Sequence, residues 1–185
     1  MSFFLIISII WVASEILLAR TKVSDKQAGT KDKFSLRIIW ITIIISIFIG
    51  MLFKYPGVGS INTAGKLIHY LGLTLIVLGL IIRWIAILKL KSMFTVDVSI
   101  QQDHKIVKSG LYKTIRHPSY LGSLLSFLGL GIALVNWISL ILIILPIFIA
   151  FNYRMKIEET VLNEEFGEEY LNYSKDTYRL FPKIY

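Results

Sequence analysis

Apolar residues occur along the chain in five long blocks that are separated by polar connections. The blocks lie at about residues 2–19, 36–53, 67–88, 119–135 and 137–153. A membrane-spanning helix needs about 20 mostly apolar residues, so each block is long enough, or nearly long enough, to cross a bilayer. Only Asn136 separates the last two blocks, which predicts a tight helical hairpin. The pattern predicts an all-α integral membrane protein with five transmembrane helices.

The polar connections predict two further elements. From Arg154 onward, apolar positions recur with helical spacing on a charged background, which predicts an amphipathic C-terminal helix that leaves the membrane. Residues 92–110 have no helical period, and we expect an ordered loop there. The first block lacks a basic leading region and a small-residue cleavage site, so we expect a helix rather than a signal peptide. No repeat or linker divides the chain, which predicts a single domain over residues 1–185, with three transmembrane helices in residues 1–90.

The composition is typical of a membrane protein and limits the kinds of partner that the protein can bind. The chain is 55% hydrophobic with a mean hydropathy of +0.68, above the range that is usual for a soluble domain. The net charge is +8, but lysine and arginine fall between the apolar blocks rather than along one face. This distribution favours membrane lipids over nucleic acid as the partner, and no feature indicates an obligate protein partner. The chain contains no cysteine, which excludes a disulfide framework and a thiolate site.

The basic residues also predict an orientation. Residues 20–37 contain six lysines and arginines, residues 54–66 contain two, and residues 91–118 and 154–185 contain five each. Because basic connections stay in the cytoplasm, five crossings with the N-terminus outside place all three basic segments on the cytoplasmic side.

Two groups of reactive side chains flank the last two blocks. The first is the run Arg116 to Tyr120, with the sequence RHPSY, at the start of the fourth block. The second begins at Arg154, with Glu158 one helical turn later. Alone, Arg154 and Glu158 are typical of an exposed ion pair. Charged groups at a membrane edge are unfavourable unless they are used, so the two groups together indicate a site.

The third block contains features that need packing partners. Arg83 lies among apolar residues, where a charge requires a partner or a route to the interface, and Glu15 is the partner that the sequence offers. Gly72 and Gly79 are small residues that allow close helix contact.

The segments HKIVKSGLYKTIRHPSYLG at 104–122 and RMKIEETVLNEEFGEEYLNY at 154–173, followed by RLFP, resemble the isoprenylcysteine carboxyl methyltransferase family. This family belongs to a wider group that includes phospholipid methyltransferases. The resemblance covers roughly residues 93–185, so residues 91–185 are the expected catalytic half. It implies S-adenosylmethionine as methyl donor, held in a cytoplasmic pocket without a Gly-rich loop.

The resemblance also implies roles for individual residues. The implied donor-binding residues are His104, Lys105, Ile106, Val107, Tyr112, His117, Pro118, Ser119, Tyr120 and Glu158. Arg154 matches the substrate-facing arginine of the family, and Arg154, Glu158 and His117 are the expected catalytic residues. A glutamine of the family lies upstream of His104, which leaves Gln101 and Gln102 as weaker candidates.

The chemistry of these side chains suits methyl transfer to a lipophilic acceptor that enters from the bilayer. Glu158 can pair with the ammonium group of the donor, and Arg154 can hold a carboxylate, such as that of a prenylated substrate. A carboxylate acceptor needs no general base. A phenol, enol or amine acceptor must lose a proton, for which His117 or Glu159 is available.

Two other classes of protein remain open from the sequence. A membrane enone or sterol reductase would use NADPH, with Lys105, Lys108 and Lys113 at its 2′-phosphate. A lipid-binding scaffold would explain the helices but not the reactive groups. The three histidines, His69, His104 and His117, lack ligand spacing, so we expect no metal site.

Overall fold

The computed structural model describes residues 3–21, 34–53, 57–61, 64–94 and 105–182. The helices are α1 (Phe3–Thr21), α2 (Phe34–Leu52), α3 (Gly65–Leu90), α4 (Pro118–Ala133), α5 (Trp137–Phe166) and α6 (Glu168–Lys175), with the 3₁₀ turns η1 (Lys91–Met93) and η2 (Gly110–Lys113). No β-strand occurs in these ranges, where pairing between extended segments is limited to isolated bridges. The described part of the chain is therefore all-α, as expected.

Four of the described helices, α1, α2, α3 and α5, are long and apolar enough to cross a membrane. Many of their large apolar side chains are exposed at the surface of the bundle, where they can contact lipid. Helix α4 is apolar but has 16 residues, or about 24 Å at 1.5 Å per residue, which is shorter than a bilayer core of about 30 Å. The protein is thus an integral multi-pass membrane protein, and a fifth crossing by α4 stays a prediction.

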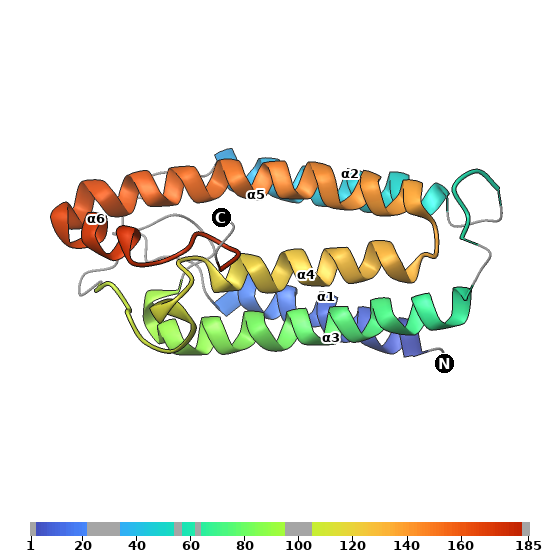
Figure 1. Ribbon diagram of the computed structural model, residues 1–185, viewed down its shortest axis with the longest axis horizontal. Coiled ribbons are helices and arrows are strands. Elements are labelled where there is room, and N and C mark those ends of the chain that lie inside the picture. Colours follow the sequence, from blue (N-terminus) through green and yellow to red (C-terminus); the bar gives the residue numbers. More distant parts are fainter. Residues whose placement is uncertain (1–2, 22–33, 54–56, 62–63, 95–104, 183–185) are drawn as a thin grey trace.

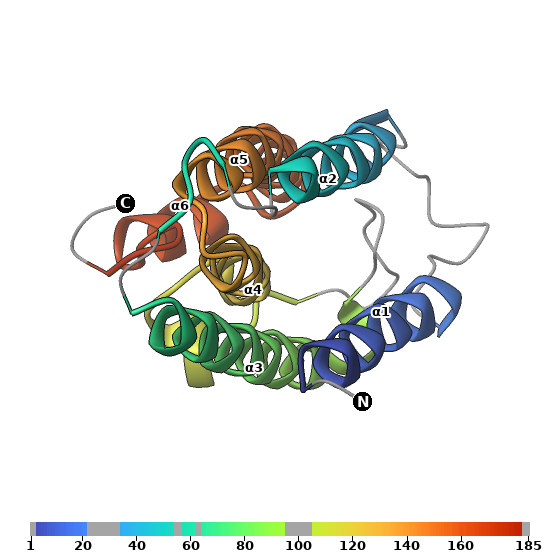
Figure 2. The same cartoon turned by 90° about the vertical axis from the view of Figure 1, so that its right-hand side faces the viewer.

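The helices form an elongated bundle in which α2 pairs with α5, α1 lies beside α3, and α4 packs between α3 and α5 (Figure 1). Figure 2 shows α1 and α2 on the side of the bundle away from the contact between α3 and α4. The N-terminus and the turn from α4 to α5 lie at one end, and α6 lies at the other end with the start of α4. The connections predicted to share one side of the membrane therefore emerge at a common end, which we call the polar end.

Glycines allow the tight packing of α3 against α4. A Cβ atom at Gly72 would lie 2.4 Å from the Ala133 nitrogen, and one at Gly79 would lie 2.5 Å from the Gly122 oxygen. On α4, a Cβ atom at Gly129 would lie 2.6 Å from the Gly72 oxygen. The prediction for Gly72 and Gly79 is confirmed, and both helices contribute the small residues that bring their backbones together.

The connection between α4 and α5 is longer than expected, and α5 itself is much longer. Helix α4 ends at Ala133, so three residues precede α5. The Asn136 side chain caps α5 by accepting from the nitrogens of Ile138 (2.9 Å) and Ser139 (3.1 Å). Helix α5 continues without a break from the apolar block, which ends at residue 153, through the charged segment to Phe166, so the predicted amphipathic helix is the continuation of α5. Gly167, with φ of 52°, ends it.

The C-terminal segment after α6 returns to the start of α4. The Tyr178 nitrogen donates to the Thr114 oxygen (2.9 Å), and the nitrogens of Arg116 and His117 donate to the oxygens of Tyr178 (2.8 Å) and Arg179 (3.2 Å). Leu180 is fully buried. These contacts fix the RHPSY run against the end of the chain.

Candidate active site

A cavity of about 580 Å³ is lined by residues of the polar end and also by residues of α1 and α2 in the apolar part of the bundle. Nine of the residues expected from the sequence line it: Lys105, Ile106, Val107, Tyr112, His117, Ser119, Tyr120, Arg154 and Glu158. They come from the segment before η2, from η2, from the connection between η2 and α4, and from α4 and α5. The structure therefore brings together residues that lie up to 53 positions apart in the sequence.

Two parts of the expected site are not on the cavity wall that the structure describes. His104, Gln101 and Gln102 lie outside the described residues. Pro118 is the first residue of α4, where proline is favoured, and does not line the cavity. Its contribution is to begin α4 directly after His117, whose backbone is non-helical.

The Tyr120 hydroxyl links Arg154 to Glu158. It donates to Glu158 Oε2 at 3.0 Å and accepts from Arg154 Nε at 3.1 Å. Arg154 Nη1 also donates to Ser35 Oγ at 2.7 Å, and Arg154 is only 3% exposed. An exposed ion pair is therefore the wrong interpretation of Arg154, which is a buried cation fixed by α2 and α4. The distance in sequence between Ser35 and Arg154 explains why no local pattern revealed Ser35.

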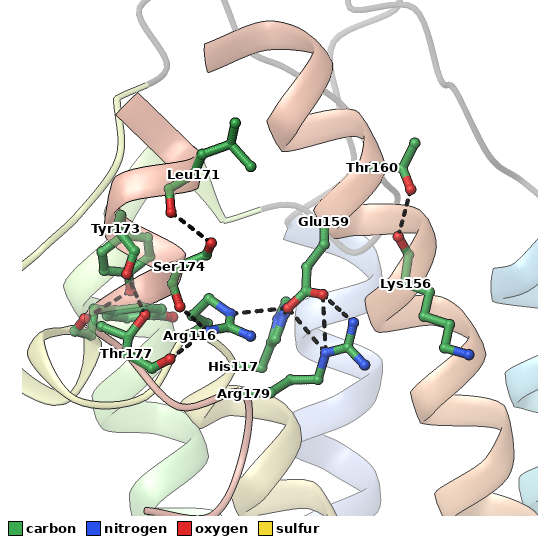
Figure 3. A network of polar contacts seen from close by, with 11 residues as sticks. Arg116, His117, Lys156, Glu159, Thr160, Leu171, Tyr173, Ser174, Thr177 and Arg179 are labelled. Atoms are coloured by element: carbon green, nitrogen blue, oxygen red, sulfur yellow. Dashed lines mark hydrogen bonds and ion pairs between the residues drawn. The ribbon is translucent and has the colours of Figure 1, made fainter. Parts of the chain in front are cut away.

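Glu159, the residue after Glu158, forms the centre of a second network (Figure 3). Its Oε1 atom lies 3.0 Å from Arg116 Nε and 3.1 Å from His117 Nε2. Arg179 contacts both carboxylate oxygens. Because a carboxylate only accepts hydrogen bonds, His117 must carry a proton on Nε2 for this contact.

This second network is structural. Arg116 Nη1 also donates to the backbone oxygens of Ser174 (2.8 Å) and Thr177, so Arg116 joins the segment before α4 to α5, to α6 and to the residues after α6. Both oxygens of Glu159 are occupied by cationic partners, which argues against Glu159 as the base that a phenol, enol or amine acceptor requires.

Tyrosines close the cavity at the polar end. The Tyr173 hydroxyl donates to the backbone carbonyl oxygen of Tyr112 at 2.7 Å, and burial raises the pKa of Tyr173 to about 12. The Tyr112 hydroxyl donates to the backbone carbonyl oxygen of Ala86 at 3.4 Å. Burial raises the pKa of Tyr112, and the charge of Glu158 raises it further. Both phenols therefore stay protonated at neutral pH and act as hydrogen-bond donors. Tyr173 was not among the residues predicted to form the site, although it lies within the second motif, at 154–173.

Glu15 and Arg83 form an ion pair where the polar and apolar parts of the cavity meet. Arg83 Nε and Nη2 bind the two oxygens of Glu15 at 2.7 and 2.8 Å. Arg83 Nη1 donates to Ser123 Oγ (2.7 Å) and Ser119 Oγ (3.1 Å). The expected partner of Arg83 is confirmed, and the pair ties α1 to α3 and to the start of α4.

Beyond this ion pair the cavity is apolar. Its walls there include Trp11 of α1, Ile43 and Ile47 of α2, and Phe127 of α4. These side chains offer a surface for a hydrocarbon chain rather than for a polar ligand.

Comparison with known proteins assigns the family. The family model described as "Isoprenylcysteine carboxyl methyltransferase (ICMT) family" matches residues 71–164. The protein-S-isoprenylcysteine O-methyltransferase of Saccharomyces cerevisiae is 36% identical over 124 residues, which cover 66% of this chain and 52% of that protein. The protein of the same name from Tribolium castaneum is 32% identical over 175 residues, 90% of this chain and 60% of that protein. The chain spans about half to three fifths of the length of these relatives.

A solved structure extends the likeness to the fold. The eukaryotic intramembrane Ras methyltransferase, an isoprenylcysteine carboxyl methyltransferase, superposes with a TM-score of 0.66 and 28% identity, over 96% of this chain and 64% of that one. The family match covers half of the chain and includes both the RHPSY run and the Arg154–Glu159 segment. This chain therefore belongs to the isoprenylcysteine carboxyl methyltransferase family.

Proposed function

We propose that this protein transfers a methyl group from S-adenosylmethionine to the carboxylate of an isoprenylcysteine-like acceptor. The observation that carries the proposal is the link from Arg154 through Tyr120 to Glu158, where a polar pocket meets an apolar cavity. A reaction between a polar nucleoside and a lipid-like acceptor needs such a junction. The names of the relatives describe this same activity.

The polar end of the cavity fits the donor. Glu158 is the carboxylate that can pair with its ammonium group, while Ile106 and Val107 supply an apolar wall for adenine. Tyr170 lines the same region, and its buried hydroxyl has no hydrogen-bond partner among the described residues. The residues present thus fit a ligand with both polar and aromatic parts. When bound, S-adenosylmethionine supplies a methyl group on a positively charged sulfur.

Arg154 is the residue that we assign to the acceptor carboxylate. Tyr120 and Ser35 hold its guanidinium in one orientation, so it is ready to bind an anion without reordering. One carboxylate oxygen takes the methyl group as an ester, and no proton moves. The chain therefore needs to orient the two reactants and exclude water, and it needs no general base for this acceptor. The apolar walls between α1 and α2 accept the lipid tail.

The comparisons do not favour the reductase or the scaffold. The named relatives are methyltransferases. Of the lysines considered for an NADPH phosphate, Lys108 pairs instead with Glu169 at 2.8 Å. A scaffold gives no reason for a buried, oriented Arg154.

The test is a transfer assay with purified protein in detergent, a radiolabelled donor and an S-prenylated cysteine peptide. We expect labelled product that is released by mild base, because esters hydrolyse and ethers or amines do not. Arg154→Ala should abolish transfer while donor binding by calorimetry is retained. A product that is stable to base would show that the methyl acceptor is a group other than a carboxylate. Absence of donor binding by the unaltered protein would overturn the proposal.

A further inference from the structure

Tyr170 differs from the other tyrosines on the cavity wall. The hydroxyls of Tyr112, Tyr120 and Tyr173 all donate to oxygens within the protein. The Tyr170 hydroxyl has no partner among the described residues, although the side chain is only 5% exposed. Buried hydroxyls without a partner are rare in native proteins, so this one requires an explanation.

The surrounding structure keeps Tyr170 in this position. Arg116 donates to the Ser174 oxygen, and Thr177 Oγ1 donates to the Tyr173 oxygen at 2.7 Å. The first contact attaches the end of α6 to the residue before His117, and the second supports the end of α6 itself. Both hold α6, and with it Tyr170, beside the cavity.

The electrostatic surroundings define the partner that this hydroxyl can bind. Burial raises the pKa of Tyr170 and the charges of Glu159 and Glu158 raise it further, while the charge of Arg116 has a smaller, opposite effect, so the phenol is neutral and can donate a hydrogen bond. Two carboxylates nearby disfavour an anion as the acceptor. A ribose hydroxyl or an adenine ring nitrogen is an uncharged acceptor, and the methyl donor contains both.

We propose that Tyr170 is a binding residue for the nucleoside part of the methyl donor, to which its hydroxyl donates a hydrogen bond. This inference rests on the proposed function, because it needs an adenosyl ligand at the polar end of the cavity. It gives α6 a direct role in binding, beyond covering the site.

The experiment compares Tyr170→Phe with Tyr173→Phe in the full chain in detergent. Each variant loses one hydroxyl from the same short helix, but only the hydroxyl of Tyr173 has a partner within the protein. Without ligand, Tyr170→Phe should raise the midpoint of thermal unfolding, because it removes an unsatisfied buried group, and Tyr173→Phe should lower it. A lower midpoint for ligand-free Tyr170→Phe would overturn the inference, because the hydroxyl would then stabilise the protein itself.

Calorimetry with two adenosyl ligands then tests the contact. S-Adenosylhomocysteine has the amino-acid end, and 5′-methylthioadenosine lacks it. We expect Tyr170→Phe to weaken the binding of both ligands by about three- to tenfold, which corresponds to the loss of one neutral hydrogen bond. Unchanged affinity for methylthioadenosine would overturn the inference and leave the proposed function intact. Failure of the unaltered protein to bind either ligand would overturn both.

Discussion

At the scale of single residues, the division of roles between Glu158 and Arg154 is the first prediction. Glu158→Ala should weaken donor binding about 10- to 100-fold, because it removes a charge-assisted hydrogen bond worth about 1.5–3 kcal/mol. Arg154→Ala leaves the contact between Tyr120 and Glu158 in place, so donor affinity should change by less than about threefold, a difference of less than about 0.7 kcal/mol.

Calorimetry with S-adenosylhomocysteine measures both variants. Glu165→Gln is the control, because it removes a carboxylate from the exposed face of α5. Equal losses in Glu158→Ala and Arg154→Ala would show that the two roles are assigned wrongly.

Much of the site could be predicted at this scale from two local motifs. The RHPSY run and the Arg154–Glu158 spacing placed both groups at one end of the bundle, and the cavity joins them. Ser35 could not be predicted, since it lies 119 positions from the Arg154 that it holds. The role of Glu159 was also hidden, because one of its partners, Arg179, is brought to it only by the return of the C-terminal segment.

At the scale of elements, the contact between α3 and α4 should tolerate no added carbon at its centre. A Cβ atom at Gly79 would lie 2.4 Å from Ser126 Oγ and 2.5 Å from the Gly122 oxygen. Gly79→Ala should therefore force the helices apart and destabilise the protein by about 1–3 kcal/mol, the usual effect of overpacking. Thermal unfolding in detergent measures the change.

Gly65→Ala is the matched control for this contact. A Cβ atom there would lie 3.5 Å from Val135 Cγ1, an ordinary contact, so stability should be nearly unchanged. A loss of stability at Gly65 as large as that at Gly79 would mean that close packing is not the cause.

Because Glu15 and Arg83 form an ion pair, we expect that replacing both residues destabilises the protein less than replacing either one alone. Glu15→Leu alone removes the carboxylate partner of Arg83, whose side chain is only 15% exposed. The loss of folding stability should therefore approach the range of about 3–5 kcal/mol found for broken buried pairs. Combining it with Arg83→Met removes both charges. The double variant should be more stable than either single variant, because apolar residues can replace a buried pair with little net loss. Thermal unfolding of the three variants tests this, and additive losses would show that the two charges act independently.

The boundaries of the elements show where local patterns stop being informative. The long apolar blocks located five of the described helices, because burial in lipid or protein requires apolar side chains along most of each helix. The last apolar block ends at residue 153, whereas α5 continues through the charged segment to Phe166. The helix extends beyond the apolar block because charged residues also form helix, and tertiary contacts of Glu158 and Glu159 support its last turns.

At the scale of the whole molecule, the remaining prediction is the orientation in the membrane and the crossing by α4. The chain contains no cysteine, so single cysteines can report the side on which each end of the bundle lies. Val58 and Trp137 are exposed at one end, close to each other through the contacts of Asn136 with Phe53 and Val58. Lys108 and Leu171 are exposed at the polar end.

In intact cells, a membrane-impermeant maleimide should label Val58→Cys and Trp137→Cys, and it should reach Lys108→Cys and Leu171→Cys only after permeabilisation. The physical reason is that the polar end contains the basic segments, which are retained in the cytoplasm. The reverse pattern would place the active site outside. Labelling of Trp137→Cys only after permeabilisation, with Val58→Cys labelled in intact cells, would contradict the shared end of the bundle and show that α4 does not cross. Because the proposed donor is a cytosolic metabolite and the proposed acceptor carries a lipid chain, a polar end on the cytoplasmic side is the arrangement in which both proposed reactants can reach Arg154 and Glu158.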